Sequence, residues 1–333
     1  MNIRKALTTL PLAAGICLAG MAASQSAQAY VYAGSKLDIT GLVVSVVNPF
    51  GGAGVTGFGF GTSTSAELNS ATDGDSDSCG GNPGLPPANN CGAASPVLKS
   101  DAANAPGSGI IRTDGDFSLS GNTVATYANS NAQIGDATLV DGLPTSLSQV
   151  SEANLVQTGN ASASTQVFSN TNLFFTFLAG PGARVVIDFI ADLTQFAEIN
   201  NAANGLSPTF DANAQFISTV SAGLTGAATA SFTSNGVSGD CSPNCVDIEV
   251  ATVTTGTFVG PGNPPTGLSN NQSTGAGNFP FPFGDPSFVA TSTPGPSAYH
   301  VELLVGACGG APVCSMTLNL NAATGVIVRN SVP

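Results

Sequence analysis

The residues best suited to chemistry in this chain are three aspartates in the run DGDSDS, namely Asp73, Asp75 and Asp77. Alternating carboxylates are typical of calcium loops, because a hard cation needs several oxygens that converge from a flexible turn. The EF-hand pattern is incomplete, since its sixth and twelfth positions need Gly and Glu but hold Ser78 and Gly84. The run can therefore be interpreted as a calcium site or as a solvated acidic turn, and we favour the turn. No other cofactor is expected.

The only histidine of the chain, His300, is the one imidazole available for acid–base chemistry. In a strand it would share a face with Glu302, so a histidine–carboxylate pair is one interpretation. No G-x-S-x-G nucleophile motif lies nearby, and the chain has no Trp to stack on a sugar. We favour a half-exposed surface histidine and expect a protein that is not an enzyme.

Six of the seven cysteines fall into three close pairs separated by turn residues. The expected disulfides are Cys79 to Cys91, Cys241 to Cys245, and Cys308 to Cys314. Six cysteines can pair in many ways, yet the short intervals favour local bridges. Zinc or iron–sulfur binding through Cys-x3-Cys is the alternative, but it needs more ligands nearby. In an exported chain we favour disulfides.

The N-terminus has the features of a secretory signal peptide. Arg4 and Lys5 precede a largely apolar run over residues 6–23, and the small-x-small sequence AQA ends at Ala29. Cleavage is expected between Ala29 and Tyr30, with export through the inner membrane. After residue 29, no stretch approaches the roughly 18 uninterrupted apolar residues of a membrane-spanning helix.

The charge balance excludes one class of partner. The whole chain has a net charge of −13, and after residue 29 five basic residues face 20 acidic ones, a net charge of −15. The five basic residues are scattered singly, whereas nucleic-acid binding needs clustered Lys and Arg. Only 8% of residues are charged, against roughly 25% in ordinary domains. The neutral polar composition is typical of exported surface material, and we expect no nucleic-acid partner.

From Ser35 onward the apolar residues follow a β-strand pattern. The alternation in KLDITGLVVSVV changes phase at Gly41, which predicts a β-bulge. Two strands about the turn at 180–182 predict a hairpin, and two more flank the loop from Cys308 to Cys314. A short helix near 194–204 is the main helical signal.

Two stretches near 70–109 and 259–297 are rich in Gly, Pro, Asn and Ser and have no hydrophobic period, so they predict long loops. Short strands, local disulfides and long loops together predict an all-β fold, an antiparallel β-sandwich or jelly roll. We expect residues 1–29 to form the signal peptide and residues 30–333 a single β-rich domain with these two loop insertions.

A known class of proteins combines such features. The signal ending in AQA, the following YVYAGSKLDITGLVV, the low charge and the Asn/Ser/Thr/Gly-rich strands resemble the exosortase-dependent surface proteins of Gram-negative bacteria, the PEP-CTERM class. Those proteins end in a sorting tail that begins Val-Pro-Glu-Pro, continues as an apolar helix and closes with a basic cluster. This chain stops at Val332-Pro333, which leads us to expect a tail that was trimmed or lost. The resemblance implies sorting to the surface or release into a polysaccharide matrix, with no catalytic residues.

Three functions follow from these observations. The leading hypothesis is a non-enzymatic cell-surface or extracellular-matrix protein whose partners are extracellular polysaccharide or other surface proteins. The alternative is an adhesin or carbohydrate-binding module with its site in loops 70–109 and 259–297. A secreted hydrolase that uses His300 with Glu302, or an acidic pair, comes third.

Overall fold

The computed structural model describes residues 30–47, 55–81, 98–135, 145–156, 163–200, 211–226, 230–234, 247–249, 267–274, 287–292, 296–308 and 310–331. Strands make up most of this described part and helices none of it, which confirms the predicted all-β class. Within the same residues, no helix has the length and apolar character needed to cross a membrane. The predicted signal peptide lies outside the described residues.

The strands form two antiparallel sheets, named A and B. Sheet A has the order β11-β15-β9-β1-β7-β6-β4, with β14 paired to β9 and β5 paired to β6. Its strands are β1 (Tyr30–Val47), β4 (Leu98–Lys99), β5 (Ala103–Asn104), β6 (Tyr127–Gly135), β7 (Thr145–Val156), β9 (Arg184–Asn200), β11 (Ala230–Ser234), β14 (Ser287–Ser292) and β15 (Ser297–Val305).

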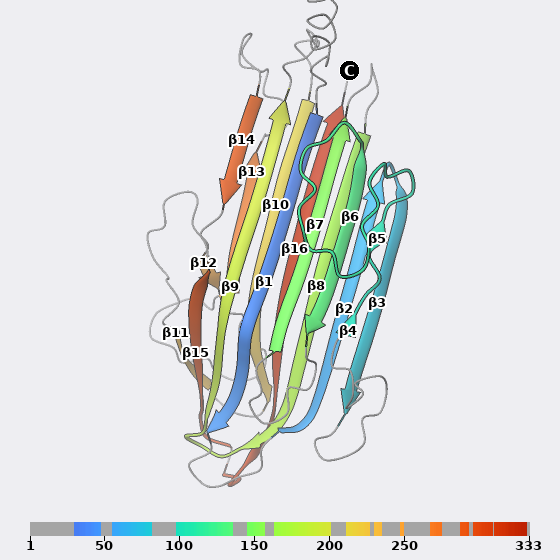
Figure 1. Cartoon of the computed structure of the whole chain (residues 1–333). Coiled ribbons are helices and arrows are strands. Elements are labelled where there is room, and N and C mark those ends of the chain that lie inside the picture. Colours follow the sequence, from blue (N-terminus) through green and yellow to red (C-terminus); the bar gives the residue numbers. More distant parts are fainter. Residues whose placement is uncertain are drawn as a thin grey trace, which may run out of the picture.

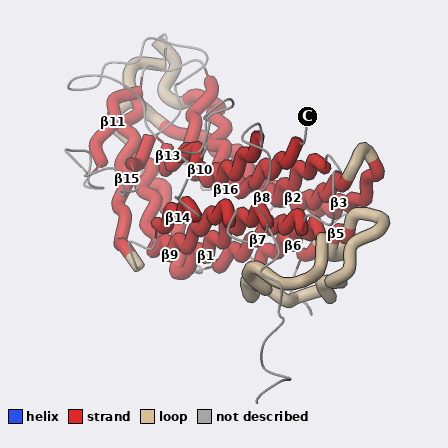
Figure 2. The backbone as a smooth tube through the Cα atoms, turned by 90° about the horizontal axis from the view of Figure 1, so that it is seen from above, coloured by secondary structure: helices blue, strands red, loops and turns tan. Residues whose placement is uncertain are grey.

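Sheet B has the order β12-β13-β10-β16-β8-β2-β3. Its strands are β2 (Val55–Leu68), β3 (Ala71–Gly81), β8 (Ala163–Ala179), β10 (Asp211–Gly226), β12 (Asp247–Glu249), β13 (Gly267–Thr274) and β16 (Cys314–Ser331). Seen from above, the two sheets lie face to face, so the predicted antiparallel β-sandwich is confirmed (Figure 2). β1 and β16 have 18 residues each, which makes the sandwich roughly 60 Å long.

The bulge in β1 is where the sequence predicts it. The pairing of β1 with β7 shifts register between Ile39 and Leu42, and Gly41 has a φ of 62°, a conformation that glycine adopts without strain. Ile39 and Leu42 are both buried. The bulge therefore keeps the apolar side chains on the inner face along the whole strand.

Both predicted hairpins are wrong. β8 and β9, joined by the turn at 180–182, belong to opposite sheets, and so do β15 and β16 on either side of the 306–313 loop. The Gly182 N–H donates to the Val305 carbonyl at 2.7 Å, so the first turn is bound to β15. Each turn thus connects the two layers of the sandwich rather than two neighbours in one sheet.

Three further elements differ from expectation. The helix predicted near 194–204 is wrong over 194–200, which continue β9. The 70–109 stretch contains β3, β4 and β5, and the 259–297 stretch contains β13 and β14, so neither is one long loop. β3 forms because it pairs along β2 from Leu68 and Ala71 to Phe58 and Gly81.

The core has two apolar clusters separated by buried polar residues. One cluster includes Phe175, Phe177 and Met316, and the other includes Val31 and Val326. Between them lie Ser35, Gln149, Ser151, Ser169, Thr171, Gln195 and Thr324, all buried.

These polar side chains bridge the two sheets. Gln149 Nε2 on β7 donates to Thr171 Oγ1 on β8 and to the Ala322 carbonyl on β16, each at 2.6 Å. Ser151 Oγ donates to the Thr324 carbonyl at 3.1 Å. Because buried polar groups need partners, these bonds favour one alignment of sheet A on sheet B.

Candidate functional site

The three aspartates of DGDSDS lie on β3, the edge strand of sheet B, rather than in a loop. They alternate along the strand and therefore share one face of it. Asp73 Oδ2 accepts the Asn104 N–H at 2.7 Å, and Asp75 Oδ2 accepts the Asp101 N–H at 2.8 Å. Two of the carboxylates thus bind the backbone of the segment that contains β4 and β5.

That segment, residues 98–105, closes one side of the sandwich. β4 and β5 pair with β6 in sheet A, while Ser100 Oγ donates to Thr62 Oγ1 on β2 at 2.8 Å. Ala103 and Ala105 are buried in the second apolar cluster. Figure 2 shows β5 between β6 and β3 at the end of the two layers. The aspartates therefore help to hold the closing segment in place.

Within the described residues, no group of three or more His, Cys, Asp or Glu side chains could hold a metal ion. Asp77 Oδ1 accepts the adjacent Ser78 N–H at 2.8 Å. Calcium binding by Asp73, Asp75 and Asp77 stays a prediction, and the geometry gives two of these carboxylates another role.

Replacement of Asp75 tests these two roles. We expect Asp75→Ala to lower the free energy of unfolding by about 1 kcal/mol, because the Asp101 N–H loses its acceptor. Asp75→Asn should cost less, since the amide oxygen can still accept. The wild-type melting temperature should be equal in calcium and in chelator. A calcium-dependent rise that Asp75→Ala abolishes would instead establish a metal site.

The most extensive polar cluster surrounds Arg112 and Glu152, both of them buried. Arg112 Nη2 donates to Glu152 Oε2 at 2.7 Å, and Arg112 Nε donates to Asn129 Oδ1 at 2.9 Å. Arg112 Nη1 donates to the carbonyls of Asp116 and Ser118 at 3.0 and 2.8 Å. All three guanidinium nitrogens are therefore hydrogen-bonded.

Both carboxylate oxygens of Glu152 also accept hydrogen bonds, two each. Oε1 accepts the Tyr32 hydroxyl at 2.8 Å and the Gly121 N–H at 2.7 Å. Oε2 accepts the Ser120 N–H at 3.0 Å in addition to Arg112. Four donors therefore converge on this buried carboxylate, and both of its oxygens are engaged within the fold.

This cluster holds the 105–126 segment against the outer face of sheet A. Figure 1 shows the segment crossing β6 and β7, and Figure 2 shows it outside the sheet A layer. β6 and most of β7 are consequently buried on both faces. Little in the sequence points to this arrangement, because Arg112 and Glu152 are 40 positions apart and no motif joins them. The rarity of charge was the one available signal.

Two tyrosines complete the cluster. Burial, reinforced by the negative charge of Glu152, raises the pKa of Tyr32 and of Tyr127 far above the usual value. Both hydroxyls therefore stay protonated and act as donors, Tyr127 to the Gly121 carbonyl at 2.6 Å. The arrangement is a network that anchors the segment.

The nearby acidic turn at Asp114–Asp116 is also engaged in local contacts. Asp114 Oδ1 accepts the Ala102 N–H at 2.9 Å. Asp116 Oδ1 accepts the hydroxyl and the N–H of Ser118, and these hydrogen bonds lower the pKa of Asp116. Both carboxylates therefore support the fold of the segment.

His300 pairs with a carboxylate other than the expected one. Its Nδ1 lies 2.6 Å from Asp188 Oδ1 on the neighbouring strand β9, with the two side chains 41% and 49% exposed. Glu302 occupies the register position opposite Val186. A partly exposed histidine on a strand agrees with the favoured interpretation.

One of the three expected disulfides is confirmed. Cys308 and Cys314 are bonded, with their Cα atoms 5.5 Å apart, within the usual range. Cys79 is also disulfide-bonded, but its expected partner Cys91 lies outside the described residues, as do Cys241 and Cys245. The pairings that involve those three cysteines stay predictions.

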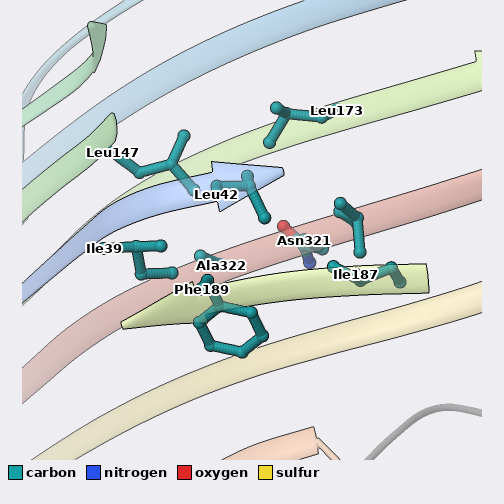
Figure 3. A pocket seen from close by; sticks show the side chains of 9 residues that line it. Ile39, Leu42, Leu147, Leu173, Ile187, Phe189, Asn321 and Ala322 are labelled. Carbon is teal, nitrogen blue, oxygen red and sulfur yellow. The ribbon is translucent and has the colours of Figure 1, made fainter. Parts of the chain in front are cut away.

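A small cavity lies inside the sandwich among side chains from both sheets (Figure 3). It is lined mainly by aliphatic residues, including Ile39, Leu173 and Ile187, and has a volume of ≈ 20 Å³. A space of about one water molecule with apolar walls is a packing gap. It offers no site for a ligand.

Comparison of the chain with protein-family models, with curated proteins and with solved structures finds no match.

Proposed function

We propose that this chain is an exported, non-enzymatic protein of the bacterial cell surface or extracellular matrix, sorted by an exosortase-type system. The sequence support is the signal-like N-terminus, the neutral polar composition and the resemblance described above. The structural support is an elongated sandwich with a disulfide in the loop between β15 and β16, a bond that persists in oxidising compartments.

The observation that carries the proposal is the position of the two ends of the described domain. Tyr30, the first residue of β1, pairs with Asn200 at the end of β9. Ser331, the last residue of β16, pairs with Asp211 at the start of β10. Figure 1 places the C-terminal side of β16 and the start of β1 at the same end of the sandwich.

This arrangement suits a protein held at a surface by a C-terminal tail. Cleavage after Ala29 would leave β1 whole. A tail that followed Ser331 would leave from the same end, so the opposite end, with the turn at 180–182 and the Cys308–Cys314 loop, would point away from the membrane.

Export and surface location can be tested together in a Gram-negative host that has an exosortase. We expect the mature protein to begin at Tyr30 and to be labelled by antibody on intact cells or recovered from the matrix. A variant with Ala27→Leu and Ala29→Leu should stay uncleaved. Retention of the wild type in the cytoplasm with residues 1–29 intact would contradict the proposal.

The sorting step needs a separate test. Deletion of the host exosortase should move the protein from the surface fraction to the cell envelope or periplasm. Unchanged surface location in the deletion strain would leave export standing but reject this sorting route.

A further inference from the structure

The outer face of sheet B has a hollow where β2 carries alternating glycines. In the run GFGFG, Phe58 and Phe60 point into the core, so Gly57, Gly59 and Gly61 face outward. The groove beside these glycines has a volume of ≈ 550 Å³, and its lining includes Gly57, Ser78, Gly80, Phe174 and Thr176 together with the buried Phe58 and Phe60. The groove is open to solvent along the sheet and does not enclose a ligand.

Phe174 on β8 supplies an exposed aromatic ring at this groove. Its register partner on β2 is Gly59, and a Cβ atom added to Gly59 would lie 2.1 Å from Phe174 Cε1. The ring therefore leans over the glycine and uses the space that a side chain would fill. Phe174 remains 43% exposed, which leaves part of the ring available for contact.

The groove and its surroundings are uncharged. One cross-strand row runs Asn319, Phe174, Gly59 and Gly80, from β16 through β8 and β2 to β3. The neighbouring rows contain Thr317 and Thr176 on one side and Gly61 and Ser78 on the other. A ligand here would meet one aromatic ring among neutral hydroxyl and amide groups, a combination that suits sugar hydroxyls and the C–H faces of sugar rings.

We propose that this face binds a neutral polysaccharide chain, laid across the strands of sheet B with a sugar ring packed on Phe174. A second copy of the protein fits less well. Phe174 is the one large exposed apolar side chain that the described residues place on this face, whereas a stable protein interface needs about 800 Å² per partner with an apolar centre. The lack of charge disfavours acidic polymers.

The inference names a partner for the proposed matrix function and rests on it for its biological setting. Its test uses the purified mature protein, so a failure would leave export and surface location untouched. It also places the binding site on a sheet face, to which the 70–109 stretch contributes Ser78, Gly80 and Gly81 as part of β3, and not in loops.

Affinity electrophoresis provides the measurement, with native gels that contain dextran, galactomannan or xyloglucan as neutral polymers and alginate or hyaluronate as acidic ones. We expect saturable retardation by at least one neutral polymer and by neither acidic one. Phe174→Ala should weaken binding about tenfold or more, and Phe174→Tyr should retain it.

Gly61→Val provides a variant beside the groove, because Gly61 is the register partner of the lining residue Ser78. A Cβ atom added to Gly61 has the Asp77 carbonyl as its nearest neighbour, at 3.8 Å, so the side chain fits, and we expect it to narrow the groove on the Ser78 side. We expect it to weaken binding to the same degree as Phe174→Ala. Ser65→Val, on the same face of β2 but outside the groove, should leave affinity within about twofold.

Four results would overturn the proposal. These are absence of retardation by every neutral polymer, a preference for alginate or hyaluronate, binding that survives both Gly61→Val and Phe174→Ala, and a sedimentation profile in which those variants abolish a dimer instead. Melting curves of each variant, expected within a few degrees of the wild type, separate loss of the groove from loss of the fold.

Discussion

Replacement of Glu152 by glutamine is expected to lower the free energy of unfolding by about 3–5 kcal/mol, because it removes the buried counterion of Arg112 and leaves only the partly exposed Asp116 carboxylate, 3.8 Å from Nη1. The side chains of Arg112 and Glu152 are 1% and 0% exposed. An amide also cannot accept all four donors that converge on the carboxylate, so at least one buried N–H or O–H loses its partner. Urea unfolding followed by circular dichroism measures the change.

The matched control is a second ion pair with the same separation. Lys36 Nζ and Asp38 Oδ2 are 2.7 Å apart, as are Arg112 Nη2 and Glu152 Oε2, but their side chains are 32% and 26% exposed. Asp38→Asn should therefore cost less than about 1 kcal/mol. Equal costs for Asp38→Asn and Glu152→Gln would mean that burial does not determine the strength of the Arg112 pair.

Proteolysis can show whether the loss of stability in Glu152→Gln is localised to the 105–126 segment. In Glu152→Gln either the Ser120 or the Gly121 N–H group loses its acceptor, because the two bond to different oxygens, so local opening should become easier. Limited digestion should then cut within 105–126 before the rest of the domain. Uniform digestion of the whole chain would contradict a local anchoring role.

The inward face of each strand could be predicted from the sequence, because burial on one side imposes a period of two that neighbouring residues reveal. Val185, Ile187 and Phe189 are buried and alternate with exposed or half-exposed positions such as Ile190. The bulge at Gly41 followed from the same rule, since a change of phase needs an extra residue.

The partner of each strand could not be predicted in this way. A strand with one buried face has the same pattern in either layer of a sandwich, so nothing local distinguishes a hairpin from a crossing between sheets. β1 lies between β7 and β9, each more than 90 residues away for most of its pairs. Those pairings depend on the packing of the whole domain.

The acidic strand β3 escaped prediction for a different reason. Most of its residues are exposed, so it lacks apolar alternation. Its strand conformation comes from the two-residue turn at Asn69-Ser70, where φ is 51° and 69°, as in the turns that suit the twist of hairpins. Asn-Ser is a weaker signal for that turn than Asn-Gly.

The same physical limit applies to the Arg112 cluster. Arg112 bonds to residues 17 and 40 positions away on β6 and β7, and Glu152 sits in a strand whose outer face would be exposed without the 105–126 segment. Burial of both charges is therefore a property of the tertiary fold, and the spacing of residues along the chain does not record it.

The buried phenols of Tyr32 and Tyr127 are expected to make the fold sensitive to alkaline pH. Their side chains are 2% and 0% exposed, and burial raises the pKa of both. In the unfolded chain each phenol ionises near pH 10. Above that pH the unfolded state binds fewer protons than the native state, so the free energy of unfolding falls as pH rises.

The expected size of this loss of stability follows from the linkage between proton binding and unfolding. The stabilisation is complete below about pH 10 and is lost at about 1.4 kcal/mol per pH unit for each tyrosine. Two tyrosines would therefore remove about 5 kcal/mol between pH 10 and pH 12, a large part of the stability of a typical domain. Urea unfolding at a series of pH values from 8 to 11.5 measures the slope.

Phenylalanine substitutions test whether the decrease in the free energy of unfolding above pH 10 comes from the two phenols. Tyr127→Phe should cost about 1 kcal/mol at pH 8, because the hydrogen bond to the Gly121 carbonyl is lost, but it should make the decline above pH 10 shallower. The variant with both Tyr32→Phe and Tyr127→Phe should lose most of that decline and become more resistant to alkali than the wild type near pH 12. The contrary result is an equal decrease in the free energy of unfolding with pH in the double variant and the wild type. In that case the buried cluster would have to open before its phenols ionise. The 105–126 segment would then be bound less firmly than its hydrogen bonds indicate.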